Sequence, residues 1–149
     1  MSRIQAIVKI RKAKQTDAAR IATLSGQLGY PTATKEMAAR LRPALRARKG
    51  VCFVAETMED GVIGWVHASV TPLLEVELRA EVNGLVVDEK ARSRGVGARL
   101  LEAAEKWARN MGCGGMSVRS NVIRDRAHEF YLRQGYEHYK TQKAFRRAL

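Results

Sequence analysis

The sequence has only two cysteines among its 149 residues, Cys52 and Cys113, and they lie far apart without metal-like spacing. This scarcity excludes a disulfide framework and gives no support for a metal site. We therefore expect both cysteines to be buried apolar residues of a cytoplasmic protein, where thiols stay reduced. A reactive-thiol role for either residue remains an alternative.

The chain also lacks a long apolar run. No stretch is long enough to span a bilayer and no secretory apolar segment is present, so we expect a soluble intracellular protein without a membrane partner. Only three prolines occur, and there is no low-complexity tract or repeat. The length is typical of one compact domain, and we expect a single domain over residues 1–149.

Acidic residues are scarce, with 15 Asp and Glu against 27 Lys and Arg, for a net charge of +12. The surplus is uneven: residues 1–50 carry 12 basic and 2 acidic side chains, residues 51–118 carry 7 and 10, and residues 119–149 carry 8 and 3. Such a surplus can attract polyanions, including nucleic acid or a phosphorylated coenzyme. Because neither aromatic interleaving nor a nucleic-acid-binding motif accompanies it, we favour a solvated surface over a nucleic-acid role.

The most informative stretch runs from Glu75 to Met111. Its first part alternates with period two, which puts polar and apolar residues on opposite faces of a strand. The polar face comprises Glu75, Glu77, Arg79, Glu81 and Asn83, and the apolar face Val76, Leu78, Ala80 and Val82. We expect the apolar face in a core and the polar face toward water or a ligand.

A glycine-rich turn follows, Arg92-Ser93-Arg94-Gly95-Val96-Gly97-Ala98, and then apolar residues at helical spacing. A helix start with few side chains presents unpaired N–H groups and the positive end of the helix dipole, a combination that binds phosphate or pyrophosphate. The alternative is a tight strand-to-helix connection. The stretch has no Gly-x-x-x-x-Gly-Lys-Ser/Thr and lacks the third glycine of a dinucleotide fingerprint, which excludes those two phosphate loops.

Leu85-Val86-Val87 followed by Arg92-Ser93-Arg94-Gly95-Val96-Gly97 resembles the central motif of the GNAT N-acetyltransferase family. The resemblance continues through Asn121, Ala127, Phe130-Tyr131, Gly135-Tyr136 and Phe145, and covers nearly the whole chain. It implies an α/β fold with a mixed, mostly antiparallel sheet, splayed central strands and about four flanking helices. It also implies an enzyme that moves the acetyl group of acetyl-CoA directly to a primary amine, and a homodimer.

The patterns predict the following further elements. Helices are expected from Thr16-Asp17 to Gly29, from Thr34 to Leu45 with a break or kink at Pro43, and from about Ile123 or Arg124 to Gln134 with a stop at Gly135. Strands are expected at Ile4–Arg11, Val51–Glu56, Val62–Val70 and Met116–Ser120, with a hairpin turn at Asp60-Gly61. A last antiparallel pair is expected at Tyr136–Tyr139 and Lys143–Arg147.

The resemblance assigns the coenzyme to one set of residues. The cofactor-binding candidates are Leu85, Val86, Val87, Arg92, Ser93, Arg94, Gly95, Val96, Gly97, Ala98, Asn121 and Arg124. Within this set the Leu85 N–H is expected to bind the oxyanion and Val87 to pair with the pantetheine arm. Gly84 fits a β-bulge that would release these groups, or only a close packing contact. Asn121 fits a helix N-cap equally well.

The catalytic candidates are Tyr131 and Glu81. In the family the matching phenol protonates the coenzyme thiolate, and a packed aromatic is the alternative for Tyr131. Some family members hold a general-base glutamate at the position that Glu81 matches, so the resemblance implies this role for Glu81. A solvated strand carboxylate is the alternative, and a water path could replace the carboxylate. His67 titrates near neutrality, although a lone strand histidine is more often structural.

The acceptor site is the least defined part. The substrate-binding candidates are Tyr30 and Glu77, with Gln27 and Thr32 as further guesses, and a cap-and-turn role is the alternative for the residues near Tyr30. The acidic strand face favours a cationic amine. A catalytically silent coenzyme-binding or nucleic-acid-associated basic module is the alternative function, motivated by the basic first third.

Overall fold

The computed structural model describes residues 7–92, 94–120, 122 and 124–149. Ser93 and Asn121, both predicted to bind the coenzyme, lie outside the described residues. So do residues 1–6, which include the start of the first predicted strand. The chain divides into two compact units, one ending at Val118 and the other beginning at Arg119.

The first unit contains a five-stranded mixed sheet. Its strands are β1 (Lys9–Lys12), β2 (Gly50–Thr57), β3 (Gly61–Val70), β4 (Arg79–Val87) and β5 (Gly115–Val118), in the spatial order β1-β2-β3-β4-β5. The first four pair antiparallel with their neighbours, and only β4 and β5 are parallel. The prediction of a mixed, mostly antiparallel sheet is confirmed.

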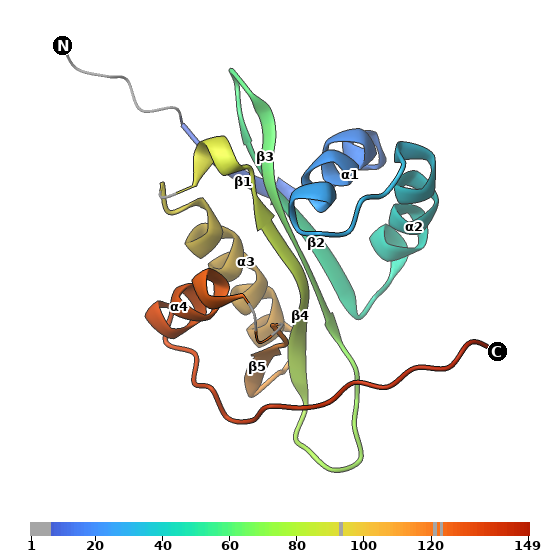
Figure 1. Ribbon diagram of the computed structural model, residues 1–149, viewed down its shortest axis with the longest axis vertical. Helices are drawn as coiled ribbons and strands as arrows, with labels where there is room; N and C mark the ends of the chain where they lie inside the picture. The colour runs from blue at the N-terminus through green and yellow to red at the C-terminus, as the bar shows by residue number, and fades with distance from the viewer. Residues whose placement is uncertain (1–6, 93, 121, 123) are drawn as a thin grey trace. The chain divides into compact units, whose positions relative to one another are not determined.

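Helices cover both faces of this sheet (Figure 1). They are α1 (Ala18–Gln27), α2 (Thr34–Arg46) and α3 (Val96–Asn110), with short 3-10 turns η1 (Gln15–Asp17) and η2 (Glu89–Ala91). Helices α1 and α2 bury Ile21, Leu24 and Leu41 against Val54 and Val86. On the opposite face, α3 buries Ala108 against Val70 and Ala80.

Three predictions about the first helices need correction. Thr34 is the first residue of α2 rather than its cap, because Ala33 holds the extended cap position. The helix also continues through Pro43 to Arg46, so the predicted break does not occur, while the predicted kink stays a prediction. Asp17 stands at the cap position of α1 but makes no side-chain cap bond, because its carboxylate is bound to Arg11 and to the Lys14 N–H.

The predicted strand from Glu75 begins only at Arg79. Pairing with β3 ends at Val70 and Ala80, so the residues before Arg79 must serve as the β3–β4 connection. The predicted apolar face is therefore interrupted: Ala80 and Val82 are buried, whereas Val76 and Leu78 are exposed. The acids Glu75 and Glu77 belong to this connection and not to the strand.

Gly84 serves in both of the roles considered for it. His67 and Ala68 of β3 pair with Gly84 and Val82, so β4 carries one extra residue and forms a β-bulge. A Cβ added at Gly84 would also lie 2.7 Å from the Trp65 ring. The bulge and the close contact are thus features of the same position.

The second unit contains helix α4 (Asp125–Arg133), which stops as predicted at Gly135. Gly135 has φ +89°, and the Tyr136 N–H donates to the Tyr131 carbonyl at 3.0 Å, which closes the helix end. The predicted strand pair at Tyr136–Tyr139 and Lys143–Arg147 is wrong, because no strand occurs in residues 136–149. Phe145 is 90 % exposed, so this segment buries too little apolar surface to stabilise a hairpin by itself.

Within the described residues, no helix combines the length and the apolar character needed to cross a bilayer.

Candidate active site

The start of α3 has the geometry of an anion-binding turn. Gly95 holds the N-cap position in the left-handed region, with φ +75°, and none of the described side chains caps the helix. The first intrahelical bond runs from the Arg99 N–H to the Gly95 carbonyl, so the N–H groups of residues 96–98 lack intrahelical acceptors. These amides and the positive end of the helix dipole favour a phosphate at this point.

The two described arginines of the turn differ in their surroundings. The Arg92 Nε donates to the Val87 carbonyl at 3.4 Å, which links the turn back to the end of β4. Arg94 is exposed. Arg92 is thus held against the strand, while Arg94 is open to solvent.

Past Val82, no described strand pairs with the edge of β4 that faces away from β3. β4 pairs with β3 along its length, but with β5 only along Arg79–Val82. The Asp88 N–H donates to the Ile63 carbonyl of β3 at 2.7 Å. Because alternate residues of a strand direct their backbone groups to opposite edges, Leu85 and Val87 direct theirs away from β3, beyond the end of β5. This is the splay expected of the central strands.

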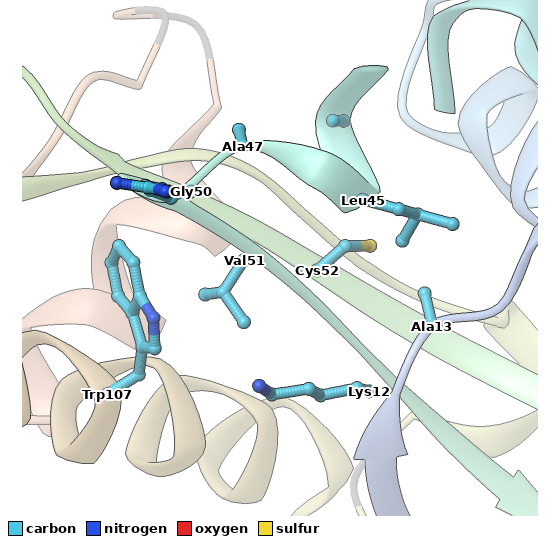
Figure 2. A pocket seen from close by; sticks show the side chains of 10 residues that line it. Lys12, Ala13, Leu45, Ala47, Gly50, Val51, Cys52 and Trp107 are labelled. Atoms are coloured by element: carbon cyan, nitrogen blue, oxygen red, sulfur yellow. The ribbon is translucent and has the colours of Figure 1, made fainter. Parts of the chain in front are cut away.

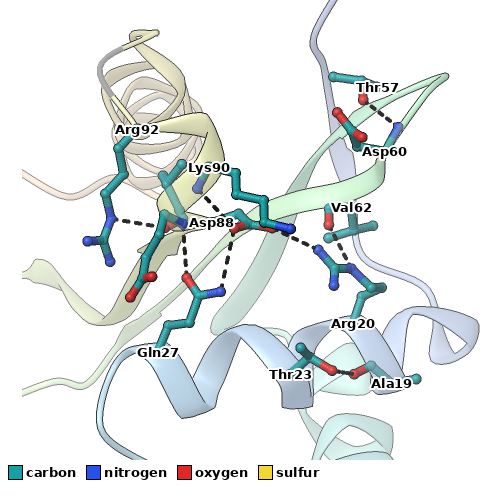
Figure 3. Close-up of polar contacts among 12 residues, drawn as sticks. Ala19, Arg20, Thr23, Gln27, Thr57, Asp60, Val62, Asp88, Lys90 and Arg92 are labelled. Carbon is teal, nitrogen blue, oxygen red and sulfur yellow. Dashed lines mark hydrogen bonds and ion pairs between the residues drawn. The ribbon is translucent and has the colours of Figure 1, made fainter.

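A polar cluster fastens α1 to the residues that lead into the turn, and Figure 3 shows its members. The Gln27 side chain donates to Asp88 at 3.5 Å and accepts from the Glu89 N–H at 3.0 Å. Arg20 donates to Asp88 at 3.2 Å and to the Val62 carbonyl at 3.0 Å. The Lys90 N–H, together with Gln27 and Arg20, holds the pKa of Asp88 below its usual value against a smaller opposing effect of burial.

The sequence reasoning missed this cluster. Gln27 was a guess for substrate contact, but its side-chain amide donates to Asp88 and accepts from the Glu89 N–H, just before the turn. The signal that could have indicated Asp88 was its position, directly after the buried strand and before the glycine-rich turn. Its partners on α1 are more than sixty positions away, so no local pattern could identify them.

The residues proposed for base and acceptor roles lie at different places. Glu81 is half-buried on β4, directly opposite Ser69 of β3. Glu77 lies in the β3–β4 connection, with its carboxylate beside Gly114. Tyr30 is exposed after α1, where its N–H donates to the Ser25 carbonyl. The structure therefore does not gather Glu81, Glu77 and Tyr30 into one contact cluster.

Tyr131 belongs to the second unit. Its ring makes edge contacts with Phe130, at 5.2 Å between centroids, and with Tyr136, at 5.8 Å. Burial raises the pKa of its phenol to about 12, so the phenol stays protonated near neutrality. Arg124 holds the N-cap position of α4 and makes no side-chain cap bond.

A cavity of about 210 Å³ lies elsewhere in the first unit (Figure 2). Lys12, Val51, Cys52 and Trp107 are among its lining residues, none of which belongs to β4 or to the glycine-rich turn. Burial raises the pKa of the Cys52 thiol to about 12, which argues against a reactive thiol there. Among the residues described, no group of three or more His, Cys, Asp or Glu could hold a metal ion.

The Acetyltransferase (GNAT) family model matches residues 17–136. The chain belongs to the GNAT acetyltransferase family. It is 27 % identical over 106 residues to the aminoglycoside N(6')-acetyltransferase type 1 of Klebsiella aerogenes, covering 69 % of this chain and 70 % of the relative. It is 32 % identical over 136 residues to the N-acetyltransferase YhfO of Bacillus subtilis strain 168, covering 87 % and 90 %.

Solved structures agree on the fold of this GNAT protein. An aminoglycoside N-acetyltransferase, AAC(6')-Iy in complex with CoA, superposes with a TM-score of 0.87 at 20 % identity, over 100 % of both chains. The protein is thus a GNAT N-acetyltransferase that uses acetyl-CoA as its acetyl donor. The uncapped start of α3 and the open edge of β4 fit this coenzyme, because the first suits a diphosphate and the second an amide-bearing arm.

Gln27→Ala is expected to weaken acetyl-CoA binding by up to about tenfold, because it removes two hydrogen bonds that hold the turn. Calorimetric titration with acetyl-CoA measures the effect. Thr23→Ala is the matched control on the same helix, since its hydroxyl bonds only the Ala19 carbonyl. An unchanged acetyl-CoA affinity in Gln27→Ala would show that the turn keeps its geometry without these two hydrogen bonds.

Proposed function

We propose that this GNAT protein transfers the acetyl group of acetyl-CoA directly to a primary amine, with residues 1–149 acting as one catalytic domain. The observation that supports the proposal most is the side-chain-free start of α3 beside the open edge of β4. The family match, which spans both units, supports it further. Acetyl-CoA supplies the activated thioester carbonyl that the amine attacks.

The chain's own residues have three tasks in this reaction. The N–H groups of residues 96–98 bind the diphosphate, with Arg92 and Arg94 adding positive charge and Ser93, Asn121 and Arg124 as further contacts. The Leu85 N–H donates to the oxyanion that develops on the carbonyl, while Val86 and Val87 align the pantetheine arm. Tyr131 protonates the departing thiolate. Glu81, directly or through water, is one candidate to receive the amine proton.

The acceptor is proposed to be a cationic amine. Glu75 and Glu77 on the exposed β3–β4 connection provide negative charge on an otherwise basic protein, and Glu77 is retained as an acceptor contact together with Tyr30. The similarity to aminoglycoside acetyltransferases makes aminoglycosides the first class to test. The two free cysteines fit an enzyme that works in the reducing cytoplasm.

The function is tested by measuring free thiol released from acetyl-CoA in the presence of pooled amines. At least one pool of aminoglycosides, polyamines or small amines is expected to give turnover, and acetyl-CoA alone is expected to give binding heat. Binding heat without thiol release from any pool would favour a catalytically silent coenzyme-binding module. Salt-sensitive DNA binding without heat on addition of acetyl-CoA would favour the nucleic-acid alternative.

We also propose that the protein forms a homodimer through its C-terminal segment. Phe145 and Leu149 are exposed in this segment, and Tyr139 is partly so, which leaves apolar surface available to a partner. Light scattering coupled to gel filtration should give about twice the monomer mass of 16.6 kDa. A monomeric mass at micromolar concentration would contradict the proposal.

A further inference from the structure

His67 occupies a central position on the α1/α2 face of the sheet. Its direct partner on β2 is Cys52, and its direct partner on β4 is Gly84. Directly paired residues share one face of a sheet. Because Cys52 packs into the core formed with α1 and α2, the imidazole lies on that same face.

The β-bulge brings His67 next to the proposed oxyanion site. Gly84 has no side chain and is followed by Leu85, whose N–H is the proposed oxyanion donor. Neighbouring strands lie about 4.8 Å apart, so the backbone of His67 is within one strand spacing of this point. The position opposite the imidazole on β4 is glycine, and the space over this glycine is taken by the ring of Trp65, the next residue of β3 on the same face.

The chemical state of the imidazole suits a proton acceptor. Burial lowers the pKa of His67 below its usual value, so the ring is neutral at physiological pH. In the part of the chain that the structure describes, the ring makes no hydrogen bond or ion pair, and the residue is only half-buried.

The face of the sheet that carries His67 has neutral groups close to it and a charged cluster at β1, where Arg11 binds Asp17 and Glu56. Cys52 on β2 is a neutral thiol, because burial, with a contribution from the Asp17 charge, raises its pKa to about 12. On its own strand, Ser69 accepts a hydrogen bond from Asn83 at 2.8 Å, and Trp65 packs into the α1/α2 core. Helices α1 and α2 contribute Leu28, Met37, Ala38 and Leu45 to that core. The titratable carboxylate on this face of β4 is Glu81, opposite Ser69.

We propose that His67 is the general base that takes the proton from the acceptor ammonium in the reaction proposed above. The imidazole receives one proton from the ammonium, and the freed amine nitrogen forms a bond to the acetyl carbon. The carbon–sulfur bond then breaks, and the nitrogen loses a second proton to solvent. Tyr131 gives its proton to the leaving thiolate and recovers one from solvent. His67 then releases the proton that it took, so that each turnover forms one amide, one thiol and one free proton.

The test compares His67→Gln and His67→Asn with the wild-type protein, using thiol release across pH 5–9 and acetyl-CoA calorimetry. Both variants are expected to lose about ten- to hundredfold in kcat while acetyl-CoA affinity changes less than about twofold. The wild-type rate should rise with pH through a midpoint below about 6.5, and the variants should lack this rise. His138→Gln, in the exposed C-terminal segment, is the matched control.

Imidazole added to His67→Ala provides a second test, because a free base can occupy the space that the substitution opens. A rate that increases with imidazole concentration supports the proposal. Wild-type rates and pH profile in both His67→Gln and His67→Asn overturn it, as does a rise with pH that disappears in Glu81→Gln but persists in His67→Gln. If wild-type protein releases no thiol with any amine, the proposed acetyl transfer itself is contradicted, whatever the His67 variants do.

Discussion

Tyr131→Phe is expected to lower kcat for thiol release about a hundredfold, a typical loss for a missing general acid. The phenol suits the task because burial raises its pKa to about 12, so it carries a proton at every pH at which the enzyme works. Phenylalanine keeps the ring contacts with Phe130 and Tyr136 and removes only the donor. Acetyl-CoA affinity should therefore stay within about twofold.

The measurement is steady-state thiol release with calorimetry of acetyl-CoA on the same protein preparations. Tyr139→Phe serves as the control, because this ring is exposed and lies beside Lys140 in the C-terminal segment. Tyr131 would be an ordinary packed aromatic if its phenylalanine variant turned over at the wild-type rate.

Arg11→Ala is expected to cost about 3 kcal/mol of unfolding free energy, because it leaves buried charge uncompensated. Arg11 binds the Asp17 carboxylate through both terminal nitrogens, at 2.8 and 2.9 Å, and donates its Nε to Glu56 at 2.9 Å. Asp17 is only 7 % exposed. Without the guanidinium, the Asp17 carboxylate keeps the hydrogen bond from the Lys14 N–H.

The same substitution should change the response to acid. Burial alone would raise the pKa of Asp17, but the bonds from Arg11 and the Lys14 N–H outweigh it and lower the pKa. Wild-type stability from this group is present above pH 4 and is lost as pH falls through the lowered pKa. In Arg11→Ala burial prevails and raises the pKa of Asp17, so the loss of stability should be largest above that pKa and should shrink as pH falls through it.

Urea unfolding at several pH values checks both parts of this prediction. Arg40→Ala is the control, because Arg40 and Glu36 form an exposed pair at 3.9 Å and its loss should cost less than about 0.5 kcal/mol. Equal losses in the two variants would show that the Arg11 cluster is no more than a surface ion pair.

Local chemistry explains the predictions that the structure confirms. Gly61, Gly95 and Gly135 all have positive φ, at a hairpin turn, a helix start and a helix stop, where glycine is the residue that adopts this conformation without strain. The apolar spacing after the glycine-rich turn likewise predicted α3, whose Leu100 and Leu101 are fully buried. These features depend on residues that are neighbours in the chain.

The failed strand predictions concern pairing between distant segments. The alternation at Glu75–Leu78 was that of a strand, but β3 ends before it can pair with these residues. The C-terminal alternation was also that of a strand pair, yet Tyr136–Leu149 contains none. Period-two patterns describe which face a residue would take and do not specify whether a neighbouring strand is present.

The amino-acid sequence by itself determined the glycine-rich turn, the helix that follows it and the family to which they point, because backbone conformation at such turns depends on adjacent residues. Only the tertiary structure decided that Gln27 and Arg20 hold Asp88, that Arg11 neutralises Asp17, and that His67 stands opposite Gly84. Nearly all of these contacts join different helices and strands. They arise because the sheet brings those elements together, and the spacing of residues along the chain does not indicate which elements will lie close together.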